Sequence, residues 1–286
     1  MGPLRVHPEN PRYFADRTGR ALYVTGFHTW NNLVDMGPSD PPAAFEYDRY
    51  LEELERTNQN FIRLWALHLL TAWKDKDWVG QFPWQRTGPG EAVDGKPRFN
   101  LEQLDAAYFA RLRERVAKAR AKRIYVSVML FEGWDAILSN RVRPDMFCFA
   151  GANNVNGVDI TSSACDGTLR GWVTLDDPKV LELQERYVRR VIEEVNEYDN
   201  VLFEICNEAG KDSHDWQDHL MQYVRDVERS LPLQHCVGQT GGMGTLNQRT
   251  YQSGADWVSP EAMAMDGFAS EYMSGACTWG EMRYDP

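Results

Sequence analysis

The feature that most constrains the fold is a recurring pattern, in which a short apolar run is followed by a stretch with helical spacing. Short apolar runs bounded by turn residues are typical of buried strands. Six such runs occur, at residues 21–27, 60–68, 123–131, 201–210, 235–239 and 256–260. Helical spacing follows several of them, as in the stripe Leu101, Leu104, Tyr108, Leu112, Val116 and Ala119.

The strand-then-helix order predicts a parallel sheet with right-handed crossovers. Repetition on this scale indicates an α/β chain with a TIM (β/α)8-type barrel, in one domain over residues 1–286. A doubly wound Rossmann-type sheet is the competing fold. No GxGxxG follows the run at 21–27, and polar and aromatic residues gather after every strand, so the barrel is favoured.

Between these elements lie segments of other character. The polar run 4–24, with its turn residues, predicts an N-terminal hairpin lid, assigned to residues 1–20. Residues 71–99 are expected to form a surface excursion, and the long segment 135–171 an active-site loop. Asn100 and Gln103 have the spacing of a helix-capping pair, as Asp177 and Pro178 have that of a helix start.

Composition limits the partners. The formal net charge of -11, without a basic patch, argues against nucleic acid and anionic membranes. A neutral carbohydrate is easier to accommodate, and the 10 Trp, 12 Tyr and 12 Phe include rings that could stack on sugars. Aromatic residues are also ordinary core residues, and for the tryptophans we weigh both interpretations equally.

The cysteines and the N-terminus point to no cofactor and no membrane segment. Five cysteines show no CxxC spacing, so we expect no zinc site and no metal. A Cys148–Cys165 bridge stays open if the protein is exported. No apolar signal region or membrane span is evident, so we expect export only if a leader was removed, and otherwise a cytoplasmic protein.

Glu208 is the main catalytic candidate. It ends the run VLFEICNE, so in a parallel barrel it stands at the rim where such folds keep their chemistry. Strict alternation would place Glu204, Cys206 and Glu208 on one side of the strand and Asn207 on the other. The plain alternative is that Asn-Glu only caps the next helix.

Further rim candidates follow the other predicted strands, where the barrel places them at its catalytic mouth. The expected substrate-binding residues are His28, Trp30, Trp65, His68, Glu132, Trp134, Gln239 and Glu261. Arg63 interrupts an apolar run and therefore needs a carboxylate partner, for which Glu204 is a candidate. His214 is expected to be a solvated residue at a helix start.

The segments NFIRLW and FEICNE resemble the retaining (β/α)8 glycoside hydrolases, in which the second strand bears an Arg and the fourth ends in Asn-Glu. The N-terminal run, the ANNVNG loop, NEAG and SGADWVSP look more closely like cellulase-like and apiosidase-like barrel proteins. The similarity covers residues 4–260. It implies that Glu208 is the general acid/base, Asn207 a donor to the sugar 2-hydroxyl, and Arg63 a support for the nucleophile.

The C-terminus departs from that pattern. After Pro260 only residues 261–286 remain, and they hold one short apolar run, Gly267 to Ala269, so strands seven and eight are expected to be missing or degenerate. Glu271 is the expected nucleophile, with Glu261 and Glu281 as alternatives. Either the C-terminal tail fills an open barrel edge or a second copy of the chain covers it, and the second case predicts a homo-oligomer.

The sequence thus predicts a glycoside hydrolase that cleaves a polysaccharide or oligosaccharide by two-carboxylate catalysis. One carboxyl group must protonate the leaving oxygen and a second must attack or stabilise the anomeric carbon. The alternative is a carbohydrate-binding barrel that has lost its second carboxylate. The sequence shows no metal-ligand cluster and no phosphate-binding motif that would favour a barrel lyase or isomerase.

Overall fold

The computed structural model of the chain describes residues 1–72, 76–133, 143–165, 168–242 and 247–260.

At its centre is a five-stranded sheet in which every neighbouring pair of strands is parallel. The spatial order follows the order along the chain: β5 (Phe61–Leu64), β10 (Tyr125–Glu132), β13 (Val201–Asn207), β14 (Val237–Thr240) and β15 (Trp257–Ser259). In a doubly wound sheet the order of the strands reverses at a switch point, whereas here the order runs one way from β5 to β15. The sequential parallel order agrees with the predicted barrel-type α/β fold and not with its doubly wound competitor.

The predicted first core strand, 21–27, was only partly right. Ala21–Leu22 forms β3 of a small antiparallel sheet. The chain then runs beside the start of β5, where the Thr25 carbonyl accepts hydrogen bonds from the backbone N–H groups of Asn60 and Phe61. The segment occupies the place of a first barrel strand without a regular ladder.

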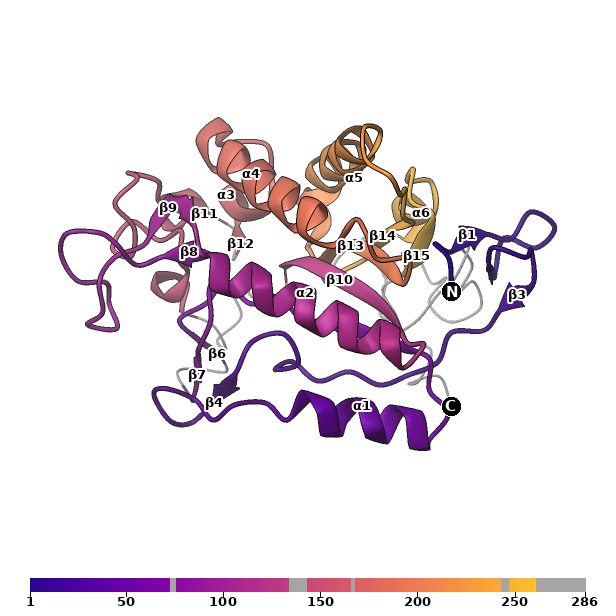
Figure 1. Cartoon of the computed structure of the whole chain (residues 1–286). Coiled ribbons are helices and arrows are strands. Elements are labelled where there is room, and N and C mark those ends of the chain that lie inside the picture. The colour runs from indigo at the N-terminus through magenta and orange to yellow at the C-terminus, as the bar shows by residue number, and fades with distance from the viewer. Residues whose placement is uncertain (73–75, 134–142, 166–167, 243–246, 261–286) are drawn as a thin grey trace.

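Successive helices pack against one another outside the sheet: α1 (Tyr47–Arg56), α2 (Ala106–Ala121), α4 (Pro178–Val195) and α5 (His214–Glu228) (Figure 1). Shorter helices are α3 (Arg170–Val173) and α6 (Asn247–Tyr251), with 3-10 turns at Pro144–Met146, Ile160–Ser163 and Lys211–Ser213. With helices covering one face, all residues of β10 and β13 are buried, as parallel strands require.

Local capping sets two of the helix starts. The Asp177 carboxylate accepts hydrogen bonds from Lys179 N at 2.9 Å and Val180 N at 3.2 Å, with Pro178 in the first turn, as predicted. The predicted Asn100–Gln103 capping pair is wrong. Asn100–Leu104 forms β9, which pairs with β8 (Trp84–Gln85), and Asp105 caps α2 instead.

The N-terminal hairpin closes the end of the sheet opposite Glu208. Its strands are β1 (Arg5–Val6), β2 (Phe14–Ala15) and β3, and its Leu4 and Phe14 share a buried apolar cluster with Phe61, Tyr125, Leu202, Cys236 and Trp257. Those five residues lie at the N-terminal ends of the parallel strands. The segment is thus a floor of the barrel rather than the lid we expected.

Residues 71–99, after β5, were expected to form a surface excursion, but part of this segment is buried. It contributes β6 (Thr71–Ala72) and β7 (Asp77–Val79), which join β4 (Met36–Gly37), and Trp84 of β8 is fully buried. A second pair, β11 (Ala164–Cys165) and β12 (Thr168–Leu169), lies in the long loop after β10. Within these segments Trp84 packs against Phe149 at 5.0 Å and against Tyr187 of α4 at 5.6 Å, measured between ring centres.

Some predictions fall beyond the described residues. The expectation that strands seven and eight are missing or degenerate concerns residues 261–286, so it stays a prediction, as does self-association at an open edge. Cys148 is a buried free thiol, and the optional bridge to Cys165 is not formed. No helix within the described ranges is both long enough and apolar enough to cross a membrane.

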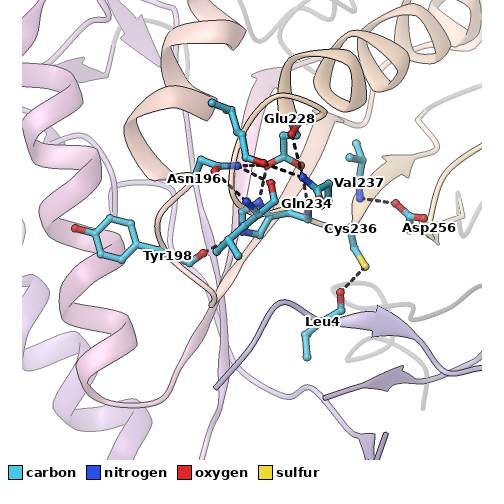
Figure 2. A network of polar contacts seen from close by, with 11 residues as sticks. Leu4, Asn196, Tyr198, Glu228, Gln234, Cys236, Val237 and Asp256 are labelled. Carbon is cyan, nitrogen blue, oxygen red and sulfur yellow. Dashed lines mark hydrogen bonds and ion pairs between the residues drawn. The ribbon is translucent and has the colours of Figure 1, made fainter. Parts of the chain in front are cut away.

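A buried polar network ties the loops at the floor of the barrel together (Figure 2). The ring of His235 contacts Glu228 Oε1 through Nδ1 at 2.6 Å and the Tyr198 carbonyl through Nε2 at 3.0 Å. Asn196 donates to Glu228 Oε1 at 2.9 Å and to the Leu233 carbonyl at 2.8 Å. Both ring nitrogens of His235 therefore face oxygen atoms in a buried site.

Breaking this pair should destabilise the fold strongly. His235→Leu removes the ring that contacts the buried Glu228 Oε1, so we expect a loss of about 1–3 kcal/mol in the free energy of unfolding. The exposed pair Arg229–Asp226 gives the control, since Arg229→Ala should change stability by less than about 1 kcal/mol. Urea denaturation measures both, and equal small losses would contradict the role given to His235.

Candidate functional site

The site is built around a buried guanidinium. Arg63 of β5 donates through Nε to Glu204 Oε2 at 2.9 Å, through Nη2 to Glu204 Oε1, and through Nη2 to Asn207 Oδ1 at 2.9 Å. Thr240 of β14 donates to Glu204 Oε1 at 3.0 Å. Arg63 and Glu204 are 3% and 0% exposed, so the expected buried ion pair is confirmed.

The network reaches a fourth strand through Asn207. Its Nδ2 donates to Glu132 Oε1 at 3.0 Å and Oε2 at 3.3 Å, and Glu132 is the register partner of Asn207 on β10. Glu132 is also buried. We call Arg63, Glu204, Asn207, Glu132 and Thr240 the Arg63 network.

Aromatic rings adjoin this network on one side. The Arg63 guanidinium lies 4.6 Å from the centre of the Trp65 ring, and the His28 ring stacks on Trp65 at 5.0 Å. Trp30 meets Trp65 edge-on at 6.5 Å and is 43% exposed. Three of the predicted rim residues are therefore together, and one of them presents an indole to solvent.

The backbone departs from regular strand geometry where Glu208 begins the rim. Strict alternation would place Glu204 and Asn207 on opposite faces, yet both contact Arg63, so the predicted partition was wrong. Glu208 itself has a φ of 45°, a left-handed conformation that is uncommon for a residue other than glycine. Backbone outliers of this kind cluster at functional sites.

Two glycines hold that backbone in place. A Cβ on Gly133 would lie 2.6 Å from Ala209 Cα and 2.7 Å from the Asn207 carbonyl oxygen, and one on Gly242 would overlap the Glu208 carbonyl group. Gly133 N also donates to the Asn207 carbonyl at 2.8 Å. Glu208, which follows directly, is half-buried and so remains accessible at the C-terminal end of the sheet.

Two predicted substrate-binding residues lie elsewhere. His68 is buried among the rings of Trp84, Phe131, Trp172 and Tyr187, in the core beneath α4. Its ring nitrogens have no hydrogen-bond partner among the described residues, and burial lowers its pKa from 6.5 to about 3. His68 is therefore neutral packing rather than part of the mouth.

Gln239 is the second predicted substrate-binding residue that lies away from the barrel mouth. Its Nε2 lies 3.2 Å from Nδ1 of His214 on α5, while the next residue, Thr240, turns toward Glu204. We expected His214 to be solvated, but it is buried. Burial, and to a smaller extent the charge of Arg249, lowers the pKa of His214.

Sequence reasoning missed two residues that build the site. Asn32 is fully buried, donates to the Arg63 carbonyl and accepts from Trp65 N at 3.0 Å, so it fixes the strand that carries both. Thr240 could have been found, because it follows Gln239 on the opposite face of the strand. Trp134, Glu261, Glu271 and Glu281 lie outside the described residues.

The asparagines of the ANNVNG loop brace the chain. Asn153 donates to the carbonyls of Asp145 and Phe147, and Asn154 to those of Ala150 and Val158. The described part of that loop is held by its own side chains. Among the described residues no group of three or more His, Cys, Asp or Glu side chains is arranged to hold a metal ion.

Comparison with solved structures identifies this type of fold. The chain superposes on a family 5 glycoside hydrolase, a mannosidase from Rhizomucor miehei, with a TM-score of 0.57 and 12% identity over 91% of this chain and 61% of that one. A protein of Bacteroides vulgatus assigned to the glycoside hydrolases gives a TM-score of 0.56 and 16% identity over 91% and 42%. The chain therefore has the TIM-barrel-type fold of family 5 glycoside hydrolases.

The chain spans only about half the length of these structures. No protein-family model and no curated protein sequence matches it.

The glycine next to Glu132 should not tolerate a side chain. Gly133→Ala forces a methyl group against the backbone of Ala209, so we expect a loss of about 1–3 kcal/mol in the free energy of unfolding. At Gly37 the same Cβ would meet only Pro42 at 3.9 Å, and Gly37→Ala serves as the control. If both variants melt like the unmodified protein in calorimetry, the close approach is not real.

His68 should make stability depend on pH. The unfolded chain binds a proton at this side chain below pH 6.5, whereas the folded protein does so only near pH 3, so stability falls as the pH drops through this window. We expect His68 to contribute a loss of about 1 kcal/mol between pH 6 and pH 5. His68→Phe should flatten urea-denaturation stability over that interval, and an unchanged slope would contradict the assignment.

Proposed function

We propose that this protein is a glycoside hydrolase that acts on a neutral, β-linked saccharide with Glu208 as the general acid/base. The observation that carries the proposal is the Arg63 network directly beneath an accessible carboxylate with an unusual backbone conformation. Four buried polar side chains gathered around one guanidinium are costly to maintain in a sheet core, and a binding or catalytic role explains their retention.

The proposed chemistry follows from the two-carboxylate mechanism. The Glu208 carboxyl group gives its proton to the glycosidic oxygen as the bond to the anomeric carbon breaks, and a second carboxylate forms a covalent bond to that carbon. Glu208 then takes a proton from water, which displaces the second carboxylate and releases the sugar. We propose Glu271 for that second role, with Glu261 and Glu281 as alternatives. A retaining mechanism requires the two carboxyl groups to lie about 5–5.5 Å apart.

Asn207 of the network and the aromatic rings beside the network would bind and orient the sugar. Both contacts of Asn207 Nδ2 run to the one carboxylate of Glu132, so a hydrogen shared between its two oxygens leaves the second amide hydrogen for the sugar 2-hydroxyl. Trp30 offers a ring face of the kind that stacks on pyranoses, next to Trp65 and His28. Net negative charge favours an uncharged substrate over an acidic one.

The substrate is to be found by a screen on the purified chain. Aryl β-glycosides, β-mannans, glucans and xylans are the first panel, with mannosides included because one structural neighbour is a mannosidase. Sugar release that inverts the anomeric configuration would contradict the retaining mechanism.

Glu208→Gln should abolish turnover on whichever substrate is found. Loss of the proton donor is expected to lower kcat by roughly 100- to 10,000-fold. Circular dichroism should stay unchanged, because the substitution keeps the shape of the side chain. The control is Glu182→Gln on the exposed face of α4, with normal activity. Saccharide binding without turnover in the unmodified protein would favour the carbohydrate-binding alternative.

A further inference from the structure

A second polar site lies outside the sheet, between α1 and α2. It is a cavity of about 500 Å³, lined by residues 45–49 at the start of α1 and by Arg111, Glu114, Arg115 and Lys118 of α2. This volume is in the range of small-molecule sites. None of its lining residues belongs to the Arg63 network.

Most charges in this cavity are already neutralised. Arg111 pairs with Asp35 at 2.5 Å, and Lys118 contacts Asp48 and Glu114, both at 2.9 Å. Arg49 lies 3.2 Å from Glu46 in an exposed pair. Of the four cationic side chains that line the cavity, Arg115 is the one that takes part in none of these pairs among the described residues.

Arg115 is buried against aromatic rings. Its side chain is 7% exposed and lies over the rings of Tyr47 at 4.2 Å and Phe45 at 5.8 Å. It makes no ion pair with any described residue, and its buried Nε has no hydrogen-bond partner there. Burial, and to a smaller extent Arg111, lowers its pKa to about 10. A buried guanidinium without a carboxylate is costly, and an anionic ligand would relieve that cost.

The start of α1 adds a second attraction for an anion. Glu46 occupies the N-cap position, and its side chain accepts no hydrogen bond from the first turn. The N-terminus of a helix carries a partial positive charge and N–H groups that lack partners within the helix. Glu46, Tyr47, Asp48 and Arg49 of this turn all line the cavity.

We propose that this cavity binds a small organic carboxylate, held by the guanidinium of Arg115. The planar fork of an arginine matches a carboxylate with two parallel hydrogen bonds. The three lining carboxylates disfavour a doubly charged group such as phosphate, whereas a single negative charge is enough to pair with Arg115. The rings of Phe45 and Tyr47 suit an apolar or aromatic body on the same ligand.

Benzoate is the probe, measured by calorimetric titration of the full chain at constant ionic strength. We expect saturable binding with a stoichiometry of one, and weaker binding of acetate and of inorganic phosphate. Arg115→Gln should weaken benzoate binding by roughly 10-fold or more. Arg120→Gln, an exposed arginine on the same helix that pairs with Asp199, should bind within about twofold of the unmodified protein.

A second measurement guards against loss of fold in Arg115→Gln. Backbone amide shifts of the unmodified protein on titration with benzoate should concentrate at residues 45–49 and 111–118. Shifts at these residues together with tighter binding of phosphate than of benzoate would overturn the assignment to a carboxylate. Shifts elsewhere, equal competition by chloride, or unaltered affinity in a folded Arg115→Gln variant would overturn the site.

Discussion

The ion pair between Arg63 and Glu204 is the interaction on which the rest of the site depends. Both side chains are almost completely buried, and desolvating them costs more than an exposed pair could return. The cost is offset because Glu204 accepts from two nitrogens of Arg63 and from Thr240, while Arg63 also donates to Asn207. Three parallel strands must therefore keep one register for these bonds to form.

That requirement carries through to the rim. Asn207 is held by Arg63 on one side and by Glu132 on the other, so the chain leaves β13 at a fixed point. The next residue, Glu208, takes a left-handed conformation, with Gly133 and Gly242 packed against the backbone beside it. The accessible carboxylate thus stands on a rigid polar base rather than on a loose loop, as a preorganised catalytic group requires.

Local sequence patterns predicted the helices and strands better than the direction in which their side chains point. The strand-then-helix repeats gave the parallel sheet and its order, and the Asp177–Pro178 start of α4 could be read from capping chemistry alone. The partnership of Arg63 with Glu204 also followed, because a buried cation needs a carboxylate. Asn100 and Gln103 misled because pairing with β8 outweighed a capping pattern of the same spacing.

Side-chain direction after a strand could not be predicted in the same way. His68 follows β5, yet four aromatic rings from distant segments enclose it, and such packing is invisible to periodicity. Gln239 and Thr240 divide between α5 and the Arg63 network by alternation, whereas Glu204 and Asn207 break alternation because both satisfy one guanidinium. Long-range hydrogen bonds decided these cases.

A crystal structure with a non-hydrolysable thio-linked analogue of the substrate found by screening tests the central claim most directly. The account predicts the bridging sulfur within about 3.5 Å of a Glu208 carboxyl oxygen, with the sugar 2-hydroxyl beside Asn207. An analogue bound with Glu208 turned away, or bound at another part of the molecule, would contradict it.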